Sequence, residues 1–159
     1  MFVPNDFELP KRLSTDRFLL RMLGASDVVL DYDAVMSSRS HLRHVFAEFD
    51  DWPAENMTIE ENLDDLQRHE KEFKNREAFA YTVMNLAEDK CLGCLYINPS
   101  GKKDFDAEVY MWVRADEIQN GLDEELYQTV ELWLKEKWPF KTVVYPGREI
   151  GWDEWDLLP

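Results

Sequence analysis

Hydrophobic and polar residues follow two different periods along the chain, and the changes of period divide it into segments. The apolar run Arg17–Leu23 is typical of a buried strand, which Gly24 ends. The preceding residues, Met1–Leu13, contain prolines and scattered apolar positions, so we expect an extended lead-in. After Ser26, apolar residues recur at three- and four-residue steps, which predicts a helix capped by Ser26.

Residues 37–56 have a mixed pattern and are expected to form a short helix or irregular chain and then a loop. A longer helix is predicted after them. Thr58 and Glu61 have the spacing of a capping box, in which each side chain accepts a hydrogen bond from the backbone of the other residue. The sequence therefore predicts a helix that begins at Thr58 and continues, with a narrow apolar face, to about Asn75.

The period changes in the second half of the chain, where segments rich in aromatic and β-branched residues are separated by turn residues. Three consecutive antiparallel strands are expected at 79–86, 91–98 and 107–114. Helical spacing returns from Leu122 to Pro139, and Lys141–Tyr145 predicts a short last strand. Together the elements predict a single α/β domain, residues 1–159, in which helices flank a mixed, mostly antiparallel sheet.

Composition and charge narrow the choice of partners. The chain has 33 acidic and 18 basic residues among 159, a formal net charge of −15. This charge repels phosphate backbones and anionic lipid, so no nucleic-acid or membrane partner is expected, whereas a cationic amine or basic peptide is attracted. Solubility alone would also explain the acidity. Because no apolar run approaches the roughly 20 residues that cross a bilayer, and the first residues do not resemble a signal peptide, we expect a cytoplasmic protein.

Five residues of the opening segment form a recognisable pattern: Thr15, Arg17, Leu20, Arg21 and Asp27. This pattern resembles the start of the GNAT family of acyl-CoA-dependent N-acetyltransferases, of the kind that modify ribosomal-protein N-termini or small amines. Trp52-Pro53 with the capping box resembles the family's acceptor loop and second helix, and residues 106–114 resemble its fourth strand. The resemblance covers about Leu13 to Tyr145 in the family's order of elements.

The resemblance implies a sheet that splays after its fourth strand and takes the pantetheine arm of acetyl-CoA into the gap. That arm would be hydrogen-bonded by the backbone of Met111, Trp112 and Val113. The pyrophosphate would be held by the turn before the next helix, at Gln119, Asn120, Gly121 and Leu122. Too few residues follow Pro146 for the family's last helix and strands, so the fold is expected to lack them.

The implied reaction is attack of an amine, on a small molecule or a peptide, at the thioester carbonyl, and it needs a base to deprotonate the ammonium. Glu108 lies at the family's frequent carboxylate position and is the expected base; a solvent-facing or lysine-paired carboxylate is the other interpretation. Tyr110 and Tyr145 are candidates for the acid that protonates the departing thiolate. The alternative function is a non-catalytic binding protein that has kept the fold and lost acetyl-CoA binding.

Two residues depart from the family's pyrophosphate turn. Ile118 stands where an arginine or glutamine is expected, and Asp123 replaces the last small residue. Between Ala115 and Glu131 there are six acidic residues and no basic one, enough to cancel a helix dipole worth about half a charge. First-turn helix stabilisation is the other explanation for these acids. On the electrostatic interpretation, Asp123→Gly is expected to tighten binding of the cofactor.

The remaining candidate groups point to structure. Cys91 and Cys94 lie on a predicted strand, where residues three apart face opposite sides, so we expect buried structural thiols and no metal site. His41 and His44 share a predicted helical face with Glu48, but further converging ligands are lacking. The tail, residues 147–159, carries tryptophans and is expected to cover the edge of the final strand or to form a homodimer interface.

Overall fold

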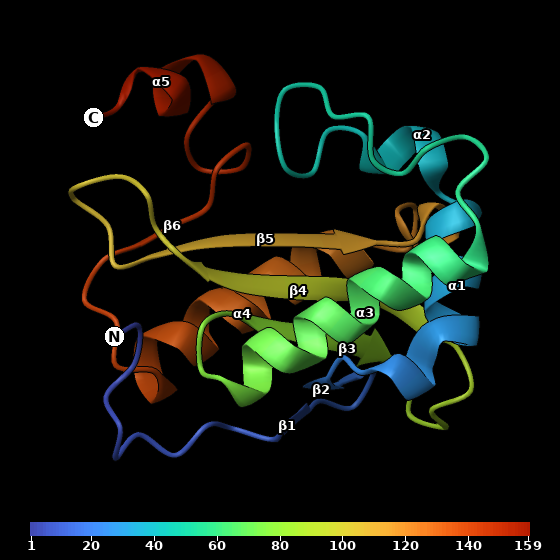
Figure 1. Ribbon diagram of the computed structural model, residues 1–159, viewed down its shortest axis with the longest axis horizontal. Helices are drawn as coiled ribbons and strands as arrows, with labels where there is room; N and C mark the ends of the chain where they lie inside the picture. The colour runs from blue at the N-terminus through green and yellow to red at the C-terminus, as the bar shows by residue number, and fades with distance from the viewer.

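The computed structural model describes all residues from 1 to 159 and contains one six-stranded sheet whose strands lie in chain order (Figure 1). The strands are β1 (Arg12–Ser14), β2 (Leu19–Met22), β3 (Phe79–Met84), β4 (Cys91–Pro99), β5 (Ala107–Val113) and β6 (Val143–Val144). Neighbours are antiparallel up to β5, and β5 and β6 are parallel. The predicted mixed, mostly antiparallel sheet is confirmed.

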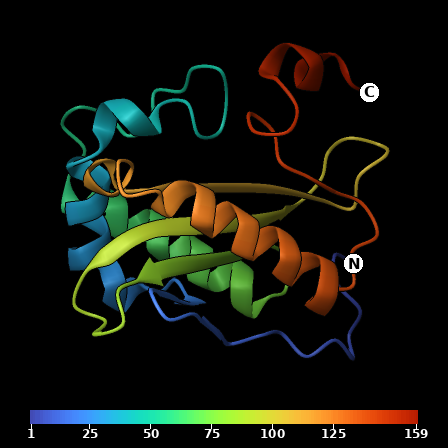
Figure 2. The same ribbon diagram turned by 180° about the vertical axis from the view of Figure 1, so that it is seen from behind.

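Helices cover both faces of the sheet. α1 and α3 lie on one face, α4 crosses the opposite face, and α5 stands in the C-terminal tail (Figures 1 and 2). The bounds are α1 (Val28–Met36), α2 (Arg39–Leu42), α3 (Ile59–Lys74), α4 (Leu122–Lys137) and α5 (Trp152–Leu157), with one-turn helices η1 (Ala25–Asp27) and η2 (Ala115–Glu117). None of these helices is both long enough and apolar enough to cross a membrane.

Two buried clusters form the core, one on each side of the sheet. The larger lies between the sheet and α4 and includes Met111 and Trp133, and the other lies under α1 and α3 and includes Leu66 and Trp112. Because successive strand residues point to opposite faces, the β5 neighbours Met111 and Trp112 belong to different clusters. The strand β5 is therefore buried on both sides.

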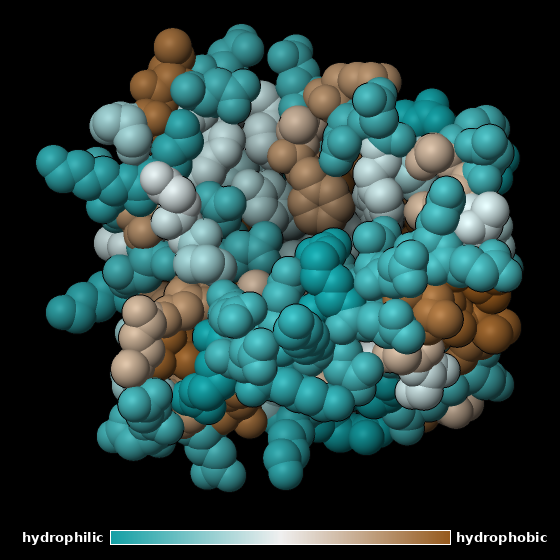
Figure 3. Space-filling view, in the orientation of Figure 1, coloured by the Kyte–Doolittle hydropathy of each residue, from teal (hydrophilic) through white to brown (hydrophobic).

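The helix predicted from Thr58 is confirmed as α3. The hydroxyl oxygen of Thr58 accepts a hydrogen bond from the backbone N–H of Glu61 at 3.2 Å, and the carboxylate of Glu61 accepts one from the N–H of Thr58 at 2.9 Å. Leu66 and Phe73 turn into the core. The outer side of α3 is hydrophilic in the space-filling view of this face (Figure 3).

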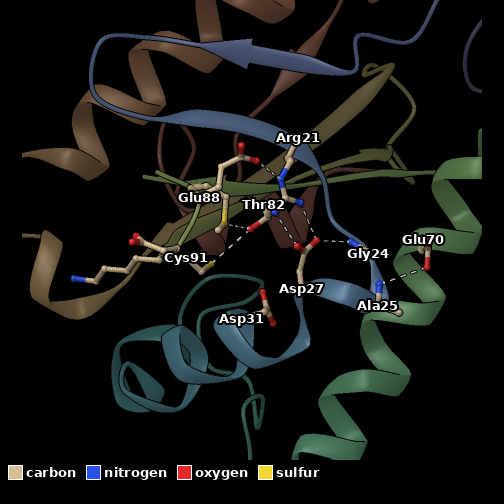
Figure 4. A network of polar contacts seen from close by, with 12 residues as sticks. Arg21, Gly24, Ala25, Asp27, Asp31, Glu70, Thr82, Glu88 and Cys91 are labelled. Carbon is tan, nitrogen blue, oxygen red and sulfur yellow. Dashed lines mark hydrogen bonds and ion pairs between the residues drawn. The ribbon is translucent and has the colours of Figure 1, made fainter. Parts of the chain in front are cut away.

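The start of the first helix differs from the prediction. Ser26 caps nothing; it lies inside η1, and α1 begins only at Val28. Instead, the carboxylate of Asp27 accepts a hydrogen bond from the backbone N–H of Gly24 at 3.0 Å and pairs with Arg21 at 2.9 Å (Figure 4). Asp27 therefore folds back to fix the corner between β2 and α1.

The extended lead-in ends in a strand that the sequence pattern does not predict. Its last residues form β1, which pairs with β2 in the register Arg12↔Arg21. The hydroxyl of Tyr81 donates to the carbonyl of Pro10 at 2.6 Å, and Arg76 donates to the carbonyl of Phe7 at 2.8 Å. A strand of three residues is too short to give a periodic signal, and β1 is specified by the free edge of β2.

Strict alternation along a strand predicts that Cys91 and Cys94 face opposite sides of the sheet. In the structure they face the same side. The register of β3 and β4 shifts between Val83 and Met84, which pair with Gly93 and Cys91. This bulge gives β4 one extra residue, so Cys91 and Cys94 both join the cluster under α1 and α3. A sequence pattern cannot show a bulge that only the pairing with another strand creates.

Candidate active site

A gap opens in the sheet between β5 and β6. The two strands pair only at Ala107 with Val143 and at Glu108 with Val144. β5 continues to Val113, whereas β6 ends and its chain turns away toward the tail (Figure 1). The edge of β5 beyond Glu108 therefore has no strand partner, and its main-chain polar groups must find other ones.

Main-chain groups of alternate β5 residues face this gap. Met111 does so, because its carbonyl oxygen accepts a hydrogen bond from the guanidinium of Arg148 at 3.0 Å. Trp112 faces β4 instead: its register partner is Cys94, and its carbonyl lies 2.0 Å from where a Cβ on Gly93 would stand. Of the three backbone groups implied for the pantetheine arm, those of Met111 and, by the same alternation, Val113 face the gap.

A cavity of about 350 Å³ lies beside this edge. Its lining combines aromatic rings, imidazoles and one ion pair, and it includes Tyr110, Met111, Trp112, Asp123, Arg148, His41 and His44. Burial lowers the pKa of His41, so this imidazole is neutral at pH 7. His44 is held by a contact of 2.5 Å between its Nδ1 and the carbonyl of Glu48.

The turn before α4 opens toward the same region. Gly121 is the N-cap of α4, with a left-handed φ of 80° and open space where a Cβ would stand. No side chain caps the helix, so its first-turn amides lack protein acceptors. Leu122 is fully buried, Gln119 is exposed, and the side chain of Asn120 is hydrogen-bonded to Glu117. An uncapped helix start of this kind attracts anions.

Basic residues form close ion pairs with half of the six acids around this turn. Three ion pairs are formed: Arg148 with Asp123 at 2.8 Å, Arg17 with Glu125 at 2.5 Å and Arg114 with Asp116 at 2.9 Å. The local count of six acids against no base therefore overstates the negative charge at the start of α4. Arg17 and Arg148 are remote in sequence, and Arg114 lies one residue before the counted segment.

Glu108 and Tyr110 lie on the same face of β5, two residues apart. Ser100 Oγ donates to the Glu108 carboxylate at 3.3 Å, and burial, together with the nearby Glu108, raises the pKa of the Tyr110 hydroxyl. Tyr145 lies on the opposite face, in the cluster against α4, with its ring 5.1 Å from that of Tyr127. The structure thus brings Glu108 and Tyr110 together and leaves Tyr145 apart.

A second cavity, of about 640 Å³, lies on the α3 side of the sheet. Five carboxylates line it, at Asp31, Asp50, Asp65, Glu72 and Glu77, against one arginine, Arg68. Burial lowers the pKa of its histidine, His69, to about 4, so that ring is neutral at pH 7. Phe46 separates this cavity from Tyr110: its ring lies 5.1 Å from that of Tyr96 and 5.4 Å from that of Tyr110.

One buried group has the donor atoms of a metal site. The ligand atoms of Asp31, Cys91 and Cys94 lie within 4.8 Å of one another, and all three residues are buried. These atoms already have protein partners: Asn62 donates to the Asp31 carboxylate at 2.9 Å, and the Cys94 thiol donates to it at 3.4 Å. The cluster is consistent with a hydrogen-bonded part of the core.

Several residues of the site were not predicted from the sequence. Arg148 lies in the predicted tail and Phe46 in the mixed segment after α2, and His41 and His44 were considered only for metal binding. Each reaches the site through the fold rather than through spacing along the chain. The one available signal was that Arg148 is the single arginine after the last strand.

No family model matches the sequence, and no curated protein matches it. Solved structures do. RimL, a ribosomal L7/L12 alpha-N-protein acetyltransferase, in its apo form has a TM-score of 0.67 at 18% identity, over 90% of this chain and 75% of that one. A putative GNAT-family acetyltransferase from Bordetella pertussis has a TM-score of 0.65 at 15% identity, over 86% and 77%.

A RimL structure in complex with coenzyme A matches with a TM-score of 0.60 at 19% identity. The match covers 76% of this chain and 64% of that one, so the chain spans a little under two thirds of that relative. These likenesses, together with the splayed sheet, show that the chain has the GNAT fold.

Proposed function

We propose that the protein is an N-acetyltransferase that moves an acetyl group from acetyl-CoA to an amine. The observation that carries this proposal is the gap between β5 and β6, which opens beside the uncapped start of α4. Main-chain groups without a strand partner and a helix N-terminus thus lie beside one cavity. Proteins of the same fold support the proposal: one was solved with coenzyme A, and the microcin C7 self-immunity acetyltransferase was solved with acetyl-CoA and AMP.

The chain's own groups fit the two ends of acetyl-CoA. An amide of the pantetheine arm would donate to the carbonyl of Met111, in place of Arg148. The diphosphate would lie at the first-turn amides of α4, next to Gly121, where the lack of a Cβ leaves room for close approach. Leu122 would contribute its backbone only, since its side chain fills the core.

In the proposed reaction, the amine nitrogen forms a bond to the thioester carbonyl carbon and the C–S bond breaks. Glu108 would take the amine's proton, directly or through water, because it is the carboxylate on the open strand. Tyr110 would return a proton to the thiolate, since its raised pKa keeps the hydroxyl protonated and it lies on the same face as Glu108. Tyr145 is less suited to this role because it packs against α4.

The acceptor is proposed to be cationic, a small amine or a basic peptide. The larger cavity supports this choice, because its carboxylates outnumber its single arginine and its histidine is neutral. Aromatic walls at Phe46, Trp52 and Tyr96 would add cation–π attraction for an ammonium. The acceptor would pass Phe46 to reach the thioester beside Tyr110.

A turnover assay tests the proposal. Release of the CoA thiol is followed with acetyl-CoA and a panel of polyamines, aminoglycosides and basic peptides. Glu108→Gln is expected to lower kcat by about 100-fold or more while leaving acetyl-CoA affinity unchanged. Glu136→Gln, an exposed carboxamide exchange at the far end of α4, is the matched control. Binding of acetyl-CoA without turnover on any amine would favour the non-catalytic alternative.

A further inference from the structure

Arg148 occupies the cleft in a fixed position. Its two terminal nitrogens each donate to one carboxylate oxygen of Asp123 at 2.8 Å, and one of them also donates to the carbonyl of Met111 at 3.0 Å. Its guanidinium carbon lies 5.4 Å from the centre of the Tyr127 ring. A bidentate ion pair and a ring contact give a flexible side chain one orientation.

The turn that carries Arg148 is itself constrained. The N–H of Arg148 donates to the carbonyl of Tyr145 at 3.1 Å, and that of Gly147 donates to Ile150 at 2.8 Å. Gly147 has a φ of 80°, and a Cβ there would stand 2.6 Å from the Trp152 ring. The tail is thus folded back tightly, and this fold points Arg148 at β5 and α4.

The guanidinium is not fully used. Its Nε hydrogen and the second hydrogen of Nη1 have no acceptor in the protein. Asp123, its partner, is in the first turn of α4, beside the uncapped amides. Two N–H groups of Arg148 are therefore available to an anion while Arg148 stays paired with Asp123.

We propose that Arg148 binds the phosphates of the acyl-CoA in this cleft, and that Asp123 positions it for this role. This inference rests on the proposed function. Arginine is suited to phosphate because its planar donors match the phosphate oxygens. When the ligand binds, a pantetheine amide takes the carbonyl of Met111, and the N–H group that Arg148 frees becomes available to another acceptor.

On this proposal Asp123 strengthens cofactor binding, whereas the local charge alone predicts that Asp123 weakens it. On a count of neighbouring acids, Asp123 repels the cofactor, and its removal tightens binding. With Arg148 held by both carboxylate oxygens, the pair is neutral, and the loss of Asp123 removes the support of the phosphate ligand. The two accounts predict opposite signs for the same substitution.

The experiment compares two ligands that differ in phosphate. Acetyl-CoA and S-acetyl-pantetheine, which lacks the diphosphate and nucleotide, are each titrated by calorimetry into the wild type, Arg148→Ala and Arg148→Lys. Arg148→Ala is expected to weaken acetyl-CoA binding by about 10- to 100-fold, the usual range for charged hydrogen bonds, and not to weaken S-acetyl-pantetheine binding, because the Met111 carbonyl is then free. Arg148→Lys is expected to lie between, and Asp123→Asn to weaken acetyl-CoA binding.

Arg12→Ala is the matched control, because it removes an ion-paired arginine outside the cleft, where Arg12 contacts Glu88 at 3.0 Å. Thermal unfolding shows whether each variant is folded. Equal or tighter acetyl-CoA binding by Arg148→Ala would overturn the inference alone, as would an equal loss for both ligands or tighter binding by Asp123→Asn. A wild type that binds neither ligand would overturn the proposed function, and the inference with it.

Discussion

Gly93 allows β4 and β5 to pair closely beside the cleft. On one edge β5 is open, so its position depends on its pairing with β4 on the other edge. A Cβ at Gly93 would stand 2.0 Å from the carbonyl oxygen of Trp112, a distance that real Cβ atoms essentially never show. Only glycine allows this approach, which holds the backbone of Trp112 against β4.

Gly93→Ala is therefore expected to destabilise the protein by about 3 kcal/mol, because the added methyl group forces two paired strands apart. Urea unfolding of both variants measures this change. Gly101→Ala is the control, since a Cβ there meets nothing within 4 Å. Equal stability of the two variants would mean that β4 and β5 can separate without cost.

Asp31 is a second residue with a measurable signature. It lies below the β2–α1 corner in Figure 4 and is only 3% exposed. Burial raises the pKa of its carboxyl from 3.8 to about 6, although hydrogen bonds from Asn62 and Cys94 oppose this shift. Because the folded pKa is above the unfolded one, the contribution of Asp31 to stability is fully present below pH 3.8 and is lost as the pH rises through about 6.

Asp31→Asn is thus expected to gain stability relative to the wild type between pH 4 and pH 8, by about 3 kcal/mol in total. Urea unfolding at several pH values gives the difference between the two proteins, in which other titrating groups cancel. Asp64→Asn, an exposed site on α3, should show no such change with pH. A constant difference between Asp31→Asn and the wild type would contradict the raised pKa.

At the same scale, sequence reasoning succeeds where a residue's partner is close along the chain. The capping box of Thr58 and Glu61 is one example, because its spacing is the whole structure. It fails for Arg148, whose carboxylate partner is 25 residues away. It also fails for Ser26, which the sequence predicts as a helix cap. Asp27 accepts a hydrogen bond from the backbone of Gly24, and no sequence pattern indicates that contact.

Among the elements, the three central strands and the two long helices follow from their periods, and only their ends move by a few residues. β1 is too short to carry a period, and it exists because β2 offers an edge. The last strand, predicted at Lys141–Tyr145, is confirmed as the shorter β6. The bulge in β4 likewise depends on its partner β3. Elements that other elements specify are those that the sequence alone does not predict.

The tail adds an element, α5, that lies against the loop between β4 and β5. Trp155 is 7% exposed and packs on Phe105, with ring centres 6.1 Å apart, and Lys102 donates to the carbonyl of Leu158 at 2.6 Å. The ring of Trp152 stacks on Tyr110 at 6.5 Å. α5 therefore lies beside the candidate active site.

Trp155→Ala is expected to lower the free energy of local opening of the tail by about 3 kcal/mol, because a buried indole is lost. Hydrogen exchange of residues 151–159 should then be faster, and the rest of the chain unchanged. Leu157→Ala removes a side chain that is 86% exposed and is the control. Unaltered exchange in Trp155→Ala would show that the tail is held by other contacts.

For the whole molecule, the sheet order, the layers and the gap in the sheet agree with the fold implied by the resemblance. The site was predicted less well. Met111 lies at the gap in the sheet and Gly121 at the start of α4, but the charge balance between them is set by remote arginines, which no local pattern reveals. The fold follows from elements that the local sequence predicts. The site depends on contacts between elements that are far apart in the sequence.

Thermal unfolding with and without acetyl-CoA is the most direct test of the central claim that the gap between β5 and β6 is an acyl-CoA cleft. A ligand that binds only the folded protein stabilises it by about 2.7 kcal/mol at 100 times its dissociation constant. The account predicts a Tm that rises with acetyl-CoA concentration and saturates. A Tm that stays constant up to millimolar acetyl-CoA would contradict it.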